Sequence, residues 1–290
     1  MKNLYECLLE DFKNPGNAQG VIRDIKKFLT TNYKIAVPKI KISKTPDSDG
    51  KYIVDIKGDI IISNKELDNL TNELFKFGVV DGNFNCSFCK ITSLIGAPKE
   101  AKFFDCSYCQ NLTSLEGAPE KVDTFSCKSC GKLSSLMDSP EIVNNFYCGF
   151  CKITSLEGAP NEVKVFDCSY CSKLINLEGA PKKADEFVCS DCESLRNLKG
   201  APKKAKSFNC SYCINLTSLE GAPKEVDYFN CDDCEELSSF KGCPDHITGE
   251  FTCMNCYISS LDGIGKIDGD IKGDIDGVDL SVLYKELKSN

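Results

Sequence analysis

Apolar residues recur along residues 84–261 with a period of 20 to 22 residues. Each copy of the repeat holds a C-x-x-C pair, a phenylalanine two residues before the first cysteine and two apolar residues after the second cysteine, and most copies close with Gly-Ala-Pro. A unit of this length cannot bury its own apolar face, so the period predicts a solenoid of stacked units. The nine pairs begin at Cys86, Cys106, Cys127, Cys148, Cys168, Cys189, Cys210, Cys231 and Cys253.

The alternation within each unit predicts a short strand. The phenylalanine and the first cysteine lie two residues apart, so both point inward, and the residue between them points outward. Stacking in register places equivalent residues about 4.8 Å apart, so that phenylalanines, thiols and leucines each form a continuous internal column. The glycine and proline that close the unit turn the chain back, and we expect no regular helix within the repeat.

The segment before the repeats shows both helical and strand periods. Residues 1–33 predict two helices that are broken at Asn14-Pro15-Gly16, and the second of them has one apolar face. Residues 39–43 predict a strand that ends in a turn at 45–50. Over residues 52–62, tyrosine, valine and isoleucine alternate with charged residues, which is typical of a half-buried strand.

A capping box follows this strand. Ser63 and Glu66 have the spacing in which each side chain bonds to the other residue's backbone, so we expect a helix from Ser63 to about Phe77. An open stack would expose its apolar core and the unpaired backbone of its first strand, and the N-terminal segment is therefore interpreted as a cap. A separate binding module is the alternative interpretation.

The C-terminal segment resembles part of the N-terminal one. The sequence DIKGDI occurs at residues 55–60 and again at 270–275, and a helix is expected over about 280–288. The predicted domains are thus an N-terminal α/β capping domain at 1–77, a solenoid of about nine repeats at 78–264 and a C-terminal strand-helix cap at 265–290.

The aligned repeats read apolar-x-x-Phe-x-Cys-x-x-Cys-x-x-Leu-x-x-Leu-x-Gly-Ala-Pro. This pattern resembles the leucine-rich repeat, L-x-x-L-x-L-x-x-N/C-x-L, with one extra residue after the second cysteine. Val122, Phe125 and Cys127 take the three strand leucine positions, and Cys130 takes the asparagine-or-cysteine position. The short period is most similar to that of the short bacterial repeats in secreted effectors, and SLEGAP resembles repeats in phage and bacterial proteins. We therefore expect an α/β-type solenoid with parallel strands, an irregular, non-helical convex side and a mixed α/β N-terminal cap.

Twenty cysteines change the interpretation of the core. The first residues carry Glu6, Glu10 and Asp11 where an export signal would be apolar, so we expect reduced thiols in the cytoplasm. C-x-x-C pairs at this spacing are also typical of zinc sites, and disulfides are a third possibility. An uninterrupted ladder has no discrete pairs of pairs, and nine copies do not resemble one redox site. We predict buried core thiols with no metal or cofactor, and stacked pairs that hold zinc are the alternative.

The sequence gives little support for catalysis. His246 is the only histidine, and no phosphate-binding loop or dinucleotide fingerprint occurs, so we expect no enzyme. Five C-terminal aspartates fit a calcium loop poorly and are interpreted as solvated charges at the end of the sheet. They are Asp268, Asp270, Asp274, Asp276 and Asp279.

The net charge of −8 disfavours nucleic acid and anionic membranes as partners, and no apolar run approaches the roughly 20 residues of a membrane span. The residues just before each cysteine instead predict an outward stripe in which aromatic side chains are mixed with aspartates. Exposed aromatics are typical anchors of protein interfaces, and the alternative is that they cover the adjacent turn. The predicted partner-binding residues are Phe88, Tyr108, Tyr147, Phe150, Tyr170, Tyr212, Asp105, Asp167, Asp191 and Asp233.

These observations predict a non-catalytic protein that binds a partner protein on the strand face of the solenoid, as an adaptor or inhibitor and, on the phage resemblance, one aimed at a host protein. A structural or assembly component that binds through its ends is the alternative function. A zinc-binding protein is the second alternative. The sequence specifies neither the partner nor the oligomeric state.

Overall fold

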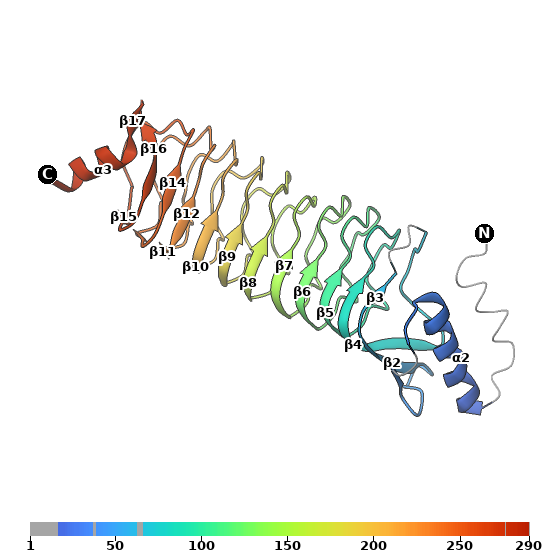
Figure 1. The fold of residues 1–290 in the computed structure, drawn as a ribbon. Coiled ribbons are helices and arrows are strands. Elements are labelled where there is room, and N and C mark those ends of the chain that lie inside the picture. The colour runs from blue at the N-terminus through green and yellow to red at the C-terminus, as the bar shows by residue number, and fades with distance from the viewer. Residues whose placement is uncertain (1–16, 37–38, 63–65, 276, 290) are drawn as a thin grey trace.

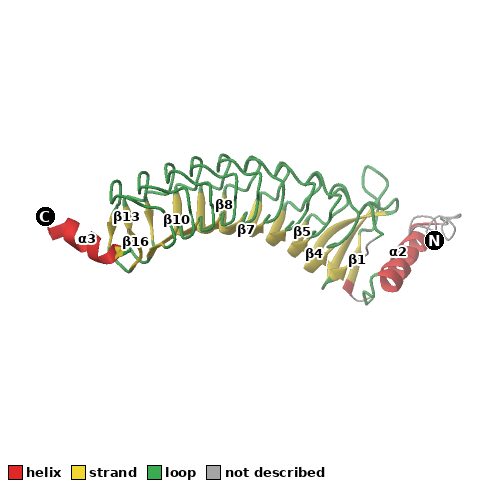
Figure 2. Cartoon of the chain, turned by 90° about the horizontal axis from the view of Figure 1, so that it is seen from above, coloured by secondary structure: helices red, strands yellow, loops and turns green. Residues whose placement is uncertain are grey.

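The computed structural model describes residues 17–36, 39–62, 66–275 and 277–289. The repeats form a parallel β-solenoid of about ten turns with little helix. The elongated stack and its single long row of strands are seen in Figure 1. We number the turns 1 to 9 by their C-x-x-C pairs, from Cys86 to Cys253. Figure 2 shows that the stack is curved, with the strands along its concave side and the loops along its convex side.

One sheet of 14 strands runs through the whole stack, in the order β1-β2-β4-β5-β6-β7-β8-β9-β10-β12-β14-β16-β17, with β3 also paired to β4. Its repeat strands are β4 (Phe75–Asn85), β5 (Glu100–Asp105), β6 (Lys121–Ser126), β7 (Ile142–Tyr147), β8 (Glu162–Asp167), β9 (Lys183–Val188), β10 (Lys204–Asn209), β12 (Tyr228–Asn230), β14 (Phe251–Cys253) and β16 (Ile271–Ile275). A second sheet of three strands joins β11 (Glu225–Val226), β13 (His246–Ile247) and β15 (Lys266–Ile267).

The register places phenylalanine on phenylalanine in successive strands, as in the pair of Phe104 with Phe125. The Phe84 and Phe104 rings are stacked with centroids 5.2 Å apart and planes within 3°. Equivalent ring contacts continue turn by turn to Phe251, and every ring of the column is buried. The predicted column of phenylalanines is therefore confirmed, because a parallel in-register stack repeats one side-chain environment along its axis.

The thiols form two further buried columns. The second cysteine of a turn donates its S–H to the carbonyl of the first cysteine of the preceding turn, as Cys130 Sγ does to Cys106 O at 3.2 Å. The first cysteine donates forward, as Cys106 Sγ does to Ser126 O at 3.3 Å. Among the described cysteines none forms a disulfide, and all but Cys256 are buried. The thiol groups thus donate hydrogen bonds to carbonyls of neighbouring turns, and they fill the core.

The loops of the repeat contain no helix between β4 and β16, a stretch that the structure describes throughout. Two buried apolar residues per turn cover the core from this side, Leu112 and Leu115 in turn 2. The glycine that follows adopts a positive φ in every turn except turn 3, where Asp138 takes its place with φ 66°. This turn lets the chain return to the next strand within a few residues.

The N-terminal segment contains α2 (Asn17–Asn32), β1 (Ile40–Ile42), β2 (Tyr52–Lys57) and β3 (Ile60–Ile61). The second predicted helix is therefore present, and the first lies outside the described residues. The single strand predicted over 52–62 is divided at Gly58, whose φ is 116°. Strand β2 pairs in parallel with β4, which runs across the predicted domain boundary after residue 77. The sheet consequently continues from this segment into the repeats without a break.

The helix predicted from Ser63 to Phe77 is wrong for its described part. Residues 66–74 have no helix, and Phe75 begins strand β4. Phe75 and Phe77 are buried, and Phe75 contacts the ring of Phe28 on α2 with centroids 6.0 Å apart. Asn72 Oδ1 accepts the Leu74 N–H at 2.8 Å, which is a local alternative to a helical bond. Pairing with β2 and burial of two phenylalanines thus outweigh the local capping signal.

The C-terminal end is closed by β17 (Val278–Asp279) and α3 (Leu280–Ser289). The hydroxyl of Tyr284 on α3 accepts the Ile267 N–H at 2.7 Å and donates to Gly265 O at 3.2 Å. Strand β17 runs antiparallel to β16, and β1 runs antiparallel to β2, so both outermost pairs of the sheet differ from the parallel pairs between them. Neither α2 nor α3 is long and apolar enough to cross a membrane, and no other helix was described.

Candidate functional site

The exposed edge at the carboxyl ends of the strands is the candidate site, and we call it the rim. In each turn the rim begins just after the first cysteine and ends just before the next buried apolar residue. It comprises residues 87–90, 107–111, 128–132, 149–152, 169–173, 190–194, 211–215, 232–236 and 254–257.

The residue before the second cysteine is in the left-handed region in all nine turns, with φ between 56° and 61°. Its N–H donates to a carbonyl of the following turn in turns 1 to 8, as Tyr108 N does to Lys128 O at 2.8 Å. For residues other than glycine, asparagine and aspartate this backbone conformation is unfavourable by about 1–2 kcal/mol. The inter-turn hydrogen bonds and the burial of the flanking cysteines hold it in place.

The residue before the first cysteine has a separate role at the strand end. Asp105 Oδ1 accepts the Ser107 N–H at 3.0 Å, and Asp167 Oδ1 accepts the Ser169 N–H at 3.0 Å. Asparagine at the same position makes the same bond, as in Asn209 with Ser211 N at 2.9 Å. These side chains cap the turn that leads into the left-handed residue. The predicted Asp105 and Asp167 are therefore engaged within the chain.

Two pairs of exposed aromatic rings lie on the rim. Phe88 and Tyr108 on turns 1 and 2 stack with centroids 4.7 Å apart, and Phe150 and Tyr170 on turns 4 and 5 stack with centroids 4.2 Å apart. These four side chains and Tyr212 on turn 7 remain 46–54% exposed. About half of each ring is thus covered by its neighbours, and the other half faces solvent.

Tyrosine and aspartate alternate on turns 5 to 8. Burial raises the pKa of Asp191 above its ordinary value, against a hydrogen bond that Tyr170 donates to it. The negative charge of Asp233, together with a hydrogen bond to it, raises the pKa of Tyr212. Asp233 Oδ1 also accepts an N–H from Asn255 at 2.9 Å. These contacts join neighbouring turns along the rim and hold the phenol groups next to carboxylates.

Lys128 on turn 3 reaches across turn 4 to turn 5. Its Nζ lies 4.6 Å from the ring centroid of Tyr147 and 2.7 Å from Asp167 Oδ2. Gly149 takes the equivalent position on turn 4 and has no side chain to obstruct the lysine. Burial alone would raise the pKa of Asp167, but hydrogen bonds from Lys128 and Ser169 and the lysine charge lower it. Tyr147 is thus half-buried beside a fixed ion pair.

The structure divides the predicted stripe into two sets. Tyr147, Asp105 and Asp167 end their strands at the concave face, whereas Phe88, Tyr108, Phe150, Tyr170, Asp191, Tyr212 and Asp233 lie on the rim in the left-handed turn. The left-handed turn could not be predicted from the sequence, because aromatic residues rarely adopt this conformation. Lys128 and Gly149 were not among the residues predicted for the site. Their departure from the serine that several other turns have at this position is visible in the aligned repeats.

Most described thiols lie in the core, and His246 lies at the surface. Burial raises the pKa of Cys109 to about 12 and that of Cys130 still further above its ordinary range. No group of three or more histidine, cysteine, aspartate or glutamate side chains has a geometry suited to a metal ion in the part of the chain that is described. His246 Nε2 lies 2.6 Å from Asp268 Oδ2 at the surface, where Lys266 also contacts Asp268.

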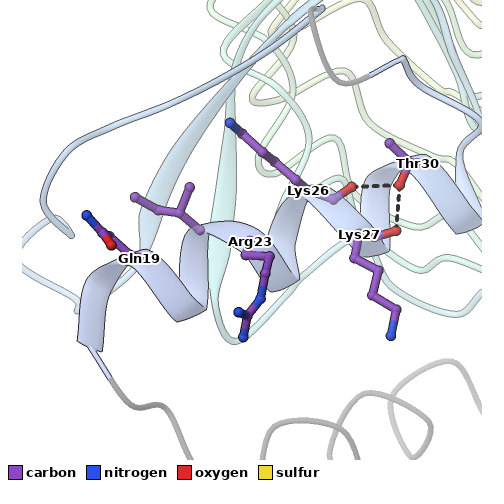
Figure 3. A pocket seen from close by; sticks show the side chains of 6 residues that line it. Gln19, Arg23, Lys26, Lys27 and Thr30 are labelled. Carbon is purple, nitrogen blue, oxygen red and sulfur yellow. Dashed lines mark hydrogen bonds between the residues drawn. The ribbon is translucent and has the colours of Figure 1, made fainter.

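A pocket lies along α2 and is lined by residues of that helix alone. Figure 3 shows its lining side chains on one helix, among them Arg23, Lys26 and Lys27. Thr30 Oγ1 donates to the carbonyls of Lys26 and Lys27 at 2.9 Å. In Figure 3 Lys26 extends to one side of the helix and Arg23 and Lys27 extend to the other, so the basic groups do not converge and this pocket is not the candidate site. Comparison with known proteins adds no relationship, because no family model, no curated protein and no solved structure matches the chain.

Proposed function

We propose that this protein is a non-catalytic binding protein whose rim and adjoining strand face hold a partner protein. One observation carries the proposal. Five of the nine left-handed positions on the rim are occupied by phenylalanine or tyrosine with about half of the side chain in solvent. Glycine, asparagine and aspartate are the residues that favour this conformation.

The fold itself does not require aromatic residues there. Ser129, Asp191 and Asn255 occupy the same position with the same φ, within a few degrees, and with equivalent turns. An exposed ring in an unfavourable backbone conformation is therefore explained by an external contact better than by folding. Exposed aromatic side chains on rigid elements are typical anchors of protein–protein interfaces, since they bury a large area and lose little conformational entropy.

The fold assignment and setting form part of the same proposal. Concave strands, convex loops and a cysteine that bonds to a carbonyl of the preceding turn support a leucine-rich-repeat type of solenoid with a mixed α/β N-terminal cap. Buried thiols without disulfides among the described residues suit a reducing compartment, and we propose a cytoplasmic adaptor or inhibitor on this ground. The phage resemblance of the repeats favours a host protein as its target.

Affinity capture from the cell that expresses the protein tests the function. The face variant replaces Tyr108, Phe150 and Tyr170 by alanine, and the control variant replaces Met137 and Ile175, which are equally exposed in the loops, by alanine. We expect the control to retain the captured protein and the face variant to lose it by at least about tenfold. Undiminished capture by a folded face variant would contradict the proposal.

A further inference from the structure

The charges of the rim are completely segregated along the stack. Turns 1 to 5 carry five lysines and no acidic residue on the rim, namely Lys90, Lys128, Lys132, Lys152 and Lys173. Turns 6 to 9 carry no basic residue on the rim and six acidic residues, of which Asp191, Glu193, Asp233, Glu235 and Glu236 reach solvent and Asp232 is buried and accepts the Met254 N–H. The exposed aromatic side chains lie in both halves.

Elsewhere on the surface opposite charges on neighbouring turns pair with each other, and two rim lysines also pair with acids outside the rim, Lys90 with Glu66 and Lys128 with Asp167. Lys102 Nζ lies 2.7 Å from Asp81, and Lys206 Nζ lies 3.4 Å from Asp185. Throughout the described residues no ion pair involves any of five exposed rim residues: Lys152, Lys173, Glu193, Glu235 and Glu236. Like charges on adjacent turns repel, so the segregation does not contribute to the stability of the single chain.

We propose that the rim binds the rim of a second copy of this chain, antiparallel, about a twofold axis between turns 5 and 6. The inference rests on the proposed function and names the partner of the same surface. Rotation by 180° about this axis brings each turn of one copy opposite the turn at the same distance on the other side of the axis. Turn 3 therefore faces turn 8, turn 4 faces turn 7 and turn 5 faces turn 6. The pairings of turns 3 with 8 and 5 with 6 join opposite charges, and the pairing of turns 4 with 7 joins two aromatic side chains and leaves Lys152 without an acidic partner.

The pairings follow from the positions of the residues along the stack. Lys132 on turn 3 lies opposite Glu235 of the second copy, and Lys173 on turn 5 lies opposite Glu193. On turns 4 and 7 the aromatic Phe150 lies opposite Tyr212. A parallel arrangement would instead place lysines against lysines and acids against acids. A second copy of this chain, turned antiparallel, carries acidic turns opposite the basic turns of the first copy, which is the order of charges that the rim requires.

The expected affinity is low and depends on salt. With this axis turns 2 to 9 face each other, and eight turns at about 4.8 Å span about 34 Å, which is the length of the contact along the stack. A single edge of this length lies at the small end of specific interfaces, where complexes are weak or transient. Exposed charge pairs are screened as the Debye length falls from about 10 Å at 0.1 M salt to about 3 Å at 1 M. We therefore expect a dimer at about 100 µM protein in low salt that dissociates in high salt.

Charge exchange tests the antiparallel order. The acidic variant carries K132E and K173E, the basic variant carries E193K and E235K, and all four positions are exposed. Each variant alone brings like charges together, so sedimentation velocity should show mostly monomer, with dimerisation weakened by about tenfold or more. An equal mixture restores opposite charges across the axis and should sediment as a dimer. The control variant K121E/K183E, on exposed strand positions outside the rim, should dimerise as the wild type does.

Three outcomes would overturn the inference. One is a wild-type chain that stays monomeric at low salt, and another is an acidic or basic variant that dimerises as well as the wild type does. The third is a mixture of folded variants that stays monomeric. Circular dichroism melts establish folding in each case. Capture of a different protein that depends on Tyr108, Phe150 and Tyr170 while the wild type is monomeric would leave the proposed function standing and remove only the second copy as partner.

Discussion

Substitution of Gly179 by alanine tests how closely the turns are stacked. Gly179 closes turn 5 with φ 86°, and a Cβ placed there would lie 2.3 Å from Glu157 N and 2.5 Å from Leu156 C, both backbone atoms of the preceding turn. Gly50 is a matched control, because its φ is 74° and a Cβ would have no atom within 4 Å. The two substitutions therefore share the conformational cost and differ in the clash.

The expected change in the free energy of unfolding follows from the hydrogen bond next to Gly179. Gly50→Ala should lower the free energy of unfolding by about 1 kcal/mol, for the left-handed conformation alone. Relief of the clash at Gly179 requires a separation of the turns by roughly 1 Å, judged against ordinary contacts of 3.4 Å or more. Such a shift breaks the 2.8 Å bond from Leu156 N to Glu178 O, and an unsatisfied buried N–H adds about 1–3 kcal/mol. We expect Gly179→Ala to cost about 2–5 kcal/mol in total.

The chain contains a natural counterpart of this perturbation. Turn 3 has Asp138 in place of the glycine. Two bonds of the inter-turn series would involve turn 3, from Leu115 N to Met137 O and from Leu136 N to Glu157 O. Neither is present among the described backbone hydrogen bonds, whereas the bond occurs between turns 4 and 5 and between the later turns as far as Phe240. The missing bond from Leu115 N to Met137 O accompanies a side chain at the glycine position, whereas the bond from Leu136 N to Glu157 O is missing although Gly158 closes turn 4.

Urea unfolding, monitored by far-ultraviolet circular dichroism, compares the free energies of unfolding of the wild type, Gly50→Ala and Gly179→Ala at the same protein concentration. Native hydrogen exchange at Leu156 reports the bond directly and should quicken only in Gly179→Ala. Equal losses of stability in the two variants, with unchanged exchange at Leu156, would refute the argument from stacking.

Three further predictions concern the core, acid stability and the thiols. Phe166→Ala removes a buried ring that stacks at 5.4 Å on a phenylalanine on each side, and urea unfolding should show a loss of about 3–5 kcal/mol in the free energy of unfolding. Phe166→Leu should lose much less, and equal losses in the two variants would contradict the stacked column. The pKa of Asp167 is lowered, so its contribution to stability is present above its unfolded pKa of about 3.9 and is lost as the pH falls through the folded value. Lys128→Ala should therefore destabilise the chain at pH 7 and reduce its loss of stability below pH 4, and an unchanged acid profile would exclude the ion pair as its cause. Burial raises the pKa of Cys109 to about 12, so iodoacetamide at pH 8 should label the partly exposed Cys256 before Cys109 and the other described cysteines in mass spectrometry. Equal labelling of these cysteines in the native chain would show that the columns are open.

Much of the core was predictable because its determinants are local and repeated. The spacing from Phe125 to Cys127 and Cys130, copied in nine turns, indicates which side chains face inward, and all three are buried. The pattern also predicted α3, which begins at Leu280 as expected. Where the expectation was wrong, at Phe75 and Phe77, a local helix signal competed with a strand partner that lies about 20 residues earlier in the chain.

By itself, the sequence determined the period, the inward columns and the presence of exposed aromatic and charged residues, since a repeat states the same local pattern many times. Only the tertiary structure decided where those exposed groups lie. The left-handed φ of Tyr108 and its counterparts depends on carbonyls of the following turn, and the contact of Lys128 with Asp167 joins residues 39 positions apart. Stacking converts a pattern along the chain into rows across it, and the rim with its two charged halves exists only in those rows.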